Sequence, residues 1–113
     1  MATLKAHWFH VLLSLADEDN HGYAIMQEVL ERTGGEVRLW PATLYGTLQR
    51  LIEAELIEES DKRPAPELDD ARRRYYRLTK LGREVLSAES ARLEDLVRVI
   101  RSKRSLAPRE VQS

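Results

Sequence analysis

The 113-residue sequence predicts a mainly α-helical protein with one small β-hairpin. Apolar residues recur at helical spacing in four separate segments, which favours four helices. Two short segments flank a stretch with two prolines, which is typical of a hairpin with a long tip. The length, with 33% charged and 42% hydrophobic residues, suits one globular domain. Cysteine is absent, so disulfides and thiolate metal sites are excluded.

The first two helices are predicted from their apolar stripes and their ends. Residues 4–15 carry apolar side chains on more than one side of a helix. Residues 22–33 carry a second stripe, and Gly34-Gly35 is a strong signal for the end of that helix. Asp19 or Asn20 precedes it and is expected to cap its N-terminus.

A third helix is predicted to begin near Trp40. Pro41 suits the first turn of a helix, where a backbone N–H would have no helical partner. Leu44, Leu48 and Leu51 form the stripe that faces the core. We expect Trp40 to pack against the start of this helix as a hydrophobic staple.

The other side of the third helix carries an unusual set of residues. An ordinary surface helix favours Glu, Lys and Ala, which promote helix formation and solubility. Gly46 by contrast costs about 1 kcal/mol relative to alanine in a helix interior. A glycine at this position is explained if the helix backbone must approach another molecule closely. It is also explained if a small residue is needed to relieve packing against another helix. The outward set is Thr43, Tyr45, Gly46, Thr47, Gln49 and Arg50.

The hairpin is predicted to have arms at residues 56–61 and 72–78. Pro64 and Pro66 interrupt any ladder between these arms. In the second arm, Tyr76 and Leu78 are expected to face the core.

A long last helix is predicted from residue 80 to about residue 104, with Thr79 as its N-cap. Apolar residues repeat every seven positions along it, a spacing that favours pairing with a second copy. Folding back onto Trp8 and Phe9 of the same chain is the alternative, and the two arrangements can combine. The predicted interface residues are Leu86, Leu93, Leu96, Val97 and Ile100.

The charge distribution allows a polyanionic partner although the net charge is −1. Residues 53–70 hold eight acidic and two basic residues, whereas residues 72–104 hold eleven basic and four acidic ones. A chain that is nearly neutral in total can therefore present a strongly positive face.

The order of three helices, a hairpin and a last helix is that of a winged helix-turn-helix domain, in which the third helix enters the DNA major groove. We therefore expect a DNA-binding domain at residues 1–78, a dimerisation helix at 79–104 and a frayed tail at 105–113. The hairpin would be the wing, with arginines along the phosphate backbone, although an arginine run is also common on a solvated strand edge. These residues are Arg63, Arg72, Arg73 and Arg74.

Three motifs resemble the PadR family of transcriptional regulators. They are H-G-Y-A-I-M-Q-E-V at residues 21–29, A-T-L-Y-G-T-L-Q-R-L-I-E-A-E-L-I-E at 42–58, and R-R-Y-Y-R-L-T-K-L-G-R at 73–83. They occur in the order typical of the family and span most of the chain. The resemblance implies a homodimeric winged-helix repressor of the short type, bound to a two-fold symmetric double-stranded operator. In many members of the family, small aromatic or drug-like molecules release the DNA.

The resemblance also suggests residue roles. The T-L-Y segment implies that Thr43 and Tyr45 lie on the recognition helix. The H-G-Y segment places His21 and Tyr23 at a helix N-terminus that can approach a phosphate. The family usually has glycine where this chain has Glu55, so a turn with positive φ is expected to be strained here.

Trp8 is the candidate for stacking on an aromatic effector, because no aromatic residue follows Tyr76. A tryptophan on an apolar helix is more often a core residue.

Other functional classes find little support. The sequence has no Gly-rich phosphate loop and no nucleophile elbow, so an enzyme is not expected. His7 and His10 have no third ligand at proper spacing, so neither a metal nor a cofactor is expected. No apolar run approaches a membrane span and no signal peptide is evident, so we expect a cytoplasmic protein. A winged helix that binds protein instead of DNA is the alternative function.

Overall fold

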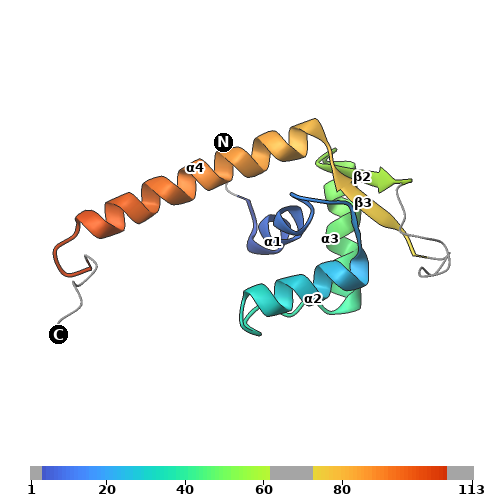
Figure 1. Ribbon diagram of the computed structural model, residues 1–113, viewed down its shortest axis with the longest axis horizontal. Helices are drawn as coiled ribbons and strands as arrows, with labels where there is room; N and C mark the ends of the chain where they lie inside the picture. The colour runs from blue at the N-terminus through green and yellow to red at the C-terminus, as the bar shows by residue number, and fades with distance from the viewer. Residues whose placement is uncertain (1–3, 62–72, 107–113) are drawn as a thin grey trace.

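The computed structural model describes residues 4–61 and 73–106. Four helices surround one core, and a small antiparallel sheet lies at one end of it (Figure 1). The elements follow the chain in the order α1 (Ala6–Ser14), β1 (Asn20–His21), α2 (Gly22–Arg32), α3 (Pro41–Glu53), β2 (Ile57–Ser60), β3 (Tyr75–Leu78) and α4 (Lys80–Ser102). This is the mainly helical fold with a hairpin that the sequence predicts.

The sheet has three strands in the order β1-β3-β2, where the sequence predicted two. The additional strand β1 pairs Asn20 with Tyr76 and His21 with Tyr75. Two residues are too short for the alternation of apolar and polar side chains that reveals a strand in a sequence. This pairing ties the start of α2 to the wing.

The N-cap of α2 is His21, one of the residues that the sequence places at the start of this helix, and not Asp19 or Asn20. The Nδ1 of His21 accepts a hydrogen bond from the Ala24 amide at 3.3 Å. His21 directly precedes Gly22, the first residue of α2, so Asn20 lies one position before the cap. The predicted C-terminal signal is confirmed, since Gly34 and Gly35 follow α2 with φ of 61° and 87°.

The core lies between the first three helices and the inner face of the sheet. The predicted stripe of α3 is fully buried in it, and Tyr76 and Leu78 of β3 close it from the sheet side. Tyr75 is buried as well, which strict alternation along the strand did not predict. The buried cluster consists of Val11, Leu12, Leu15, Ile25, Val29, Leu39, Leu44, Leu48, Leu51, Leu56, Ile57, Tyr76 and Leu78.

The turn that connects α3 to β2 contacts the start of α4 through a hydrogen bond. Glu55 has φ of 62°, which confirms the strained turn expected from the absence of glycine. Its carbonyl accepts a hydrogen bond from the Thr79 hydroxyl at 2.7 Å. Thr79 is also the predicted N-cap of α4, since its Oγ1 accepts from the Gly82 amide at 2.9 Å.

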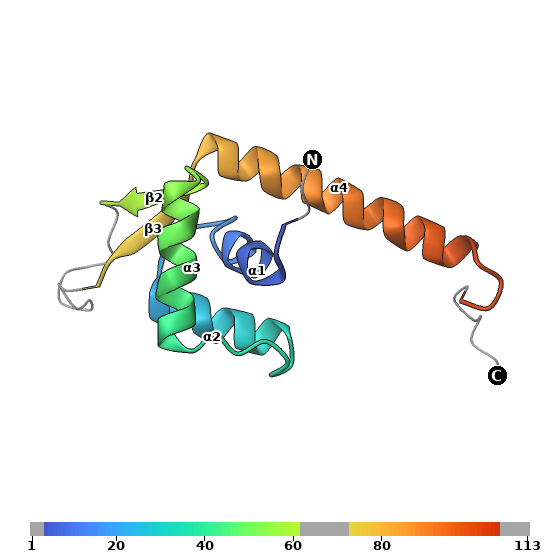
Figure 2. The same ribbon diagram turned by 180° about the vertical axis from the view of Figure 1, so that it is seen from behind.

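The helix α4 packs on the domain with its first half and extends beyond it with its second half. Val85 and Leu86 contact the core, whereas the C-terminal half of the helix points away from the other elements (Figures 1 and 2). The first half of α4 therefore folds back onto the domain, as one alternative predicted, whereas pairing of the outer half with a second copy stays a prediction. No helix in the described ranges has the length and apolar character needed to cross a bilayer.

Candidate nucleic-acid interface

The polar side of α3 is open to solvent over most of its length. In the view from behind, α3 crosses in front of α2 and the sheet, with α1 at its side (Figure 2). Thr43, Tyr45, Gln49 and Arg50 are exposed, and Gly46 is partly exposed. The helix therefore combines a buried leucine stripe with an outer arc of hydroxyl, amide and guanidinium groups. Such groups can bind base edges and phosphates.

Thr47 was wrongly placed on this outer arc. Its side chain is 3% exposed and lies where α3 meets the start of α1. The reason is that the apolar stripe is wider than three leucines, and position 47 is one turn from position 44 on its buried edge.

Packing within the protein does not explain Gly46. A Cβ built there would meet only the Nη1 of Arg50, at 3.8 Å, which is ordinary contact. The alternative that this glycine relieves helix packing is therefore wrong. A close approach by an external molecule, the other explanation, stays a prediction.

A hollow of about 480 Å³ lies where the starts of α2, α3 and β3 meet. Its lining residues come from all three elements, and several of them were predicted from the sequence as DNA-binding residues. They are His21, Gly22, Tyr23, Tyr45, Arg73, Arg74 and Tyr76. We call this the α2–α3 hollow.

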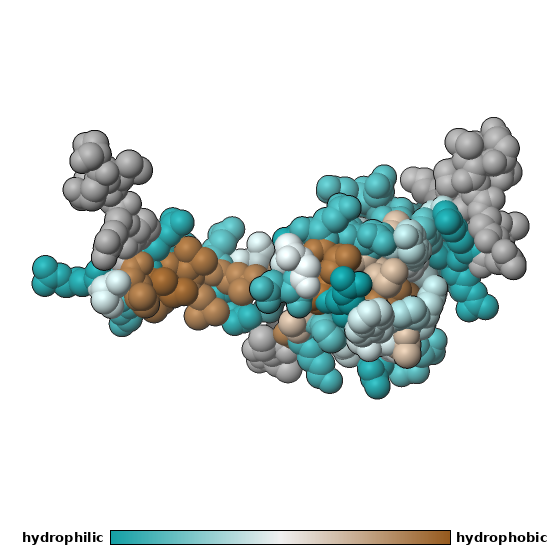
Figure 3. All heavy atoms as spheres, turned by 90° about the horizontal axis from the view of Figure 1, so that it is seen from below, coloured by the Kyte–Doolittle hydropathy of each residue, from teal (hydrophilic) through white to brown (hydrophobic). Residues whose placement is uncertain are grey.

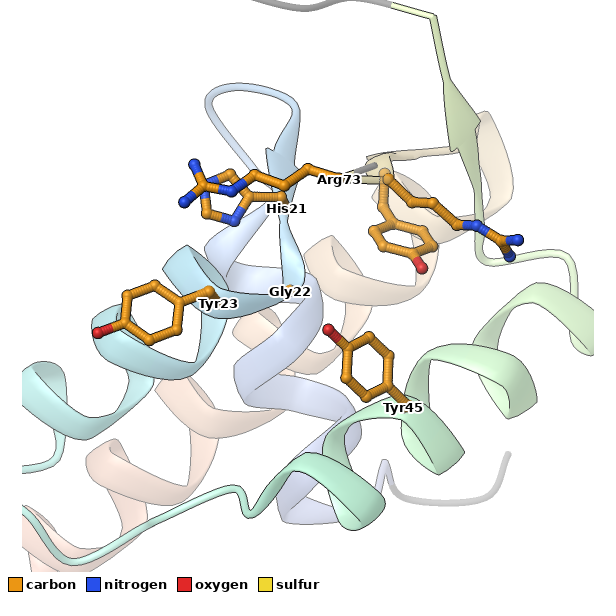
Figure 4. A pocket seen from close by; sticks show the side chains of 7 residues that line it. His21, Gly22, Tyr23, Tyr45 and Arg73 are labelled. Atoms are coloured by element: carbon orange, nitrogen blue, oxygen red, sulfur yellow. The ribbon is translucent and has the colours of Figure 1, made fainter. Parts of the chain in front are cut away.

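Hydrogen-bond donors gather at one corner of the α2–α3 hollow. The Nδ1 of His21 accepts a hydrogen bond from the Ala24 amide. The other ring nitrogen, Nε2, lies 3.4 Å from a guanidinium nitrogen of Arg73. Figure 4 shows the two side chains lying against each other above the start of α2. The positive end of the helix dipole is at the same place, which favours an anion.

Tyrosines form the wall between this corner and α3. The Tyr45 hydroxyl points from α3 toward Gly22 (Figure 4), and a Cβ built at Gly22 would lie 3.3 Å from it. Gly22 thus lets the two helices approach at this wall. Burial and the nearby Glu59 raise the pKa of Tyr76, so its hydroxyl remains a donor at neutral pH.

Of the four arginines predicted to contact DNA from the wing, two lie in the described part of the chain. Arg73 and Arg74 are exposed and reach the α2–α3 hollow. Arg74 lies 4.0 Å from Glu59, and both side chains are more than half exposed, so this ion pair holds the arginine weakly. The predicted contacts Arg63 and Arg72 lie outside the described residues.

Trp40 is exposed, contrary to the prediction that it packs against the start of α3. Its side chain is 63% exposed, so it is no hydrophobic staple. The Arg38 guanidinium carbon lies 5.2 Å from the centre of its ring. Stacking on arginine replaces the apolar neighbour that the prediction assumed.

Trp8 is half-buried and packs against the core, in agreement with the more common role of such a residue. No group of three or more potential metal ligands occurs among the residues that the structure describes.

The outer half of α4 carries a continuous apolar surface. Figure 3 shows it as one brown patch on this helix. Leu96, Val97 and Ile100 are 45%, 43% and 48% exposed, while Leu86 and Leu93 are partly buried.

Comparison with known proteins agrees with this architecture. The model of the Transcriptional regulator PadR-like family matches residues 11–88. The chain is 41% identical over 91 residues to the transcriptional regulator Rv3488 of Mycobacterium tuberculosis, covering 80% of this chain and 78% of that protein. It is 36% identical over 85 residues to Uncharacterized protein X of Lysinibacillus sphaericus, covering 74% of this chain and 75% of that protein.

Solved structures show the same fold. A transcriptional regulator from Clostridium thermocellum superposes with a TM-score of 0.68 at 23% identity, over 87% of this chain and 89% of that chain. A PadR family transcription regulator from Clostridium difficile superposes with a TM-score of 0.67 at 26% identity, over 84% of this chain and 96% of that chain.

Proposed function

This chain belongs to the PadR-like family of transcriptional regulators, and from that premise we propose that it is a homodimeric repressor that binds a two-fold symmetric DNA operator. The observation that carries the proposal is the exposed polar arc of α3. Its side chains are placed for base edges, and the α2–α3 hollow beside it gathers donors suited to a phosphate. Membership of a family of transcriptional regulators agrees with the expectation that the protein is not an enzyme.

The homodimer is inferred from the apolar surface of α4. A helix that extends from a small domain cannot cover such a surface alone, and pairing with the same surface of a second copy removes it from water. A two-fold dimer then presents two copies of α3 about one DNA turn apart, roughly 34 Å.

Release of the operator by a planar aromatic molecule is the further part of the proposal. Trp8 and Trp40 are the only tryptophans, and Trp40 is the more exposed of the two. Titrating aromatic compounds into the wild type and into Trp8→Phe and Trp40→Phe variants should quench the fluorescence of the residue that stacks on the ligand. Unchanged fluorescence in the wild type would argue for a repressor without an aromatic effector.

The DNA-binding function is tested by selecting bound sequences from a random DNA pool. We expect a two-fold symmetric site, bound with an affinity that falls steeply as salt is added. A flat salt dependence would favour the alternative, a winged helix that binds protein.

The role of the polar arc is tested with Tyr45→Ala and Arg50→Ala. Each should weaken binding to the selected site about tenfold, as expected for a lost base or phosphate contact. Lys103→Ala at the end of α4 is the control, because it removes an exposed cation far from α3. Full affinity in both variants would show that another surface binds the DNA.

A further inference from the structure

A second hollow, of about 260 Å³, lies between the start of α1 and α3. It shares no lining residue with the α2–α3 hollow. Its lining residues are Lys5, His7 and Trp8 from α1 and Ala42, Thr43, Gly46, Thr47 and Arg50 from α3. We call it the α1–α3 hollow.

The two hollows lie on opposite flanks of the exposed arc of α3. Thr43, Gly46 and Arg50 are three and four positions apart, which places them on one side of the helix. They border the α1–α3 hollow, whereas Tyr45 borders the α2–α3 hollow. The arc that faces solvent therefore lies between two recesses, one formed with α1 and the other with α2 and the wing.

The lining of the α1–α3 hollow suits a phosphate group. Lys5, His7 and Arg50 are exposed, and no acidic residue is among the residues that line it. The Lys5 ammonium lies 5.8 Å from the centre of the Trp8 ring, so the indole holds this cation at the hollow.

Gly46 keeps the α3 wall of the hollow open. Since a Cβ there would clash with nothing inside the protein, the glycine provides space only toward the outside. A phosphate backbone that approaches α3 on this flank would use that space.

In double-stranded DNA, two phosphate backbones flank the major groove, as the two hollows flank the exposed arc of α3. A helix in the major groove, about 12 Å wide, has one backbone on each side. We propose that the α1–α3 hollow binds the backbone of the second DNA strand through Lys5 and His7, with Trp8 as its apolar wall, while the α2–α3 hollow faces the first strand. This inference rests on the proposed DNA-binding function.

The test compares Lys5→Gln and His7→Gln with the wild type over a range of salt concentrations. Loss of the Lys5 charge lowers the slope of log affinity against log salt by about 0.9 and weakens binding at 0.1 M salt by about tenfold, whereas His7→Gln removes a hydrogen-bonding ring and should weaken binding. The loss should be equal for the selected operator and for DNA of random sequence, because phosphates carry no sequence information. Circular dichroism and thermal unfolding check that the variants fold as the wild type does.

Lys103→Gln is the matched control, since it makes the same chemical change on an exposed lysine at the end of α4. It should leave the slope unchanged. A second measurement uses Trp40→Phe, in which Trp8 is the only tryptophan. DNA should change its emission, because the backbone would lie against the ring.

The outcomes separate the two proposals. If Lys5→Gln keeps the wild-type slope and His7→Gln keeps the wild-type affinity while Tyr45→Ala weakens binding, the α1–α3 hollow is not a backbone site and the DNA-binding function stands, because Tyr45 does not line that hollow. The same conclusion follows if the loss is confined to the operator, since that would indicate base contacts. A wild type that does not bind DNA overturns both proposals.

Discussion

Gly46 and Gly82 are both helical glycines, yet their surroundings differ. A Cβ at Gly82 would lie 2.0 Å from the carbonyl oxygen of Leu56, so only glycine lets the start of α4 approach the end of the α3–β2 turn. Gly46 has open space beside it. One glycine is thus required by the fold, and the other is available for function.

Alanine substitutions should separate these two roles. Gly82→Ala should lower the free energy of unfolding by about 1–3 kcal/mol, because the clash is with backbone that must move. Gly46→Ala should raise it by up to about 1 kcal/mol, because alanine favours helix, while weakening DNA binding. Urea unfolding and gel shifts measure both effects. An equal loss of stability in the two variants would contradict this assignment.

At the same scale, His10 makes stability depend on pH. Its Nδ1 is buried without a hydrogen-bond partner among the described residues. Burial, with smaller contributions from Arg32 and His7, lowers the pKa of His10 below the usual 6.5. The unfolded chain therefore takes up this proton at higher pH than the folded one, so protonation favours unfolding.

We expect the free energy of unfolding to be highest above about pH 7 and to fall as the pH drops through and below 6.5. His10→Gln should show a smaller fall than the wild type between pH 7.5 and 5.5, measured by urea unfolding. An identical fall in both proteins would mean that other groups cause the pH dependence.

At the scale of elements, α3 and α4 each have a surface that does not pack against the core and is exposed to solvent. In α3 this surface is polar, which suits DNA, and in α4 it is apolar, which suits a second copy of the chain. The buried face of α3 and the packed first half of α4 fix the position of each helix relative to the core. The exposed surfaces are therefore held on rigid elements, as binding surfaces require.

A charge on the apolar side of α4 should separate the proposed dimer. Val97→Glu places a carboxylate where the two helices would meet, and burying it unpaired is unfavourable. Light scattering should then show a monomer at concentrations where the wild type is a dimer. Ala91→Glu is the control, because Ala91 is exposed on the opposite side of α4. If both variants remain dimeric, the interface lies elsewhere on the protein.

At the scale of the whole molecule, the proposed dimer predicts the spacing of the operator half-sites. Two copies of α3 held by one pair of α4 helices would bind the same face of the DNA when the half-sites are one turn apart. Inserting about 5 bp, half a turn, between the half-sites turns them to opposite faces. The affinity should then fall to that of a single half-site, as measured by gel shift. Undiminished affinity would indicate independent binding by monomers.

By itself the sequence determined the fold class, the leucine stripe of α3, the cap at Thr79, the strained turn at Glu55 and the family. The fold class, the stripe and the cap depend on residues close together in the chain, whose spacing records which side of an element is buried. The family and the turn at Glu55 came from the resemblance of three motifs, and not from spacing.

Only the tertiary structure decided the rest of the candidate site. Strand β1, the burial of Thr47 and the exposure of Trp40 depend on neighbours distant in the chain. The two hollows beside α3 are formed by side chains from α1, α2 and β3 that no single stretch of sequence contains. Spacing along a chain specifies which face of an element is buried, but which groups meet across elements is determined by packing in three dimensions.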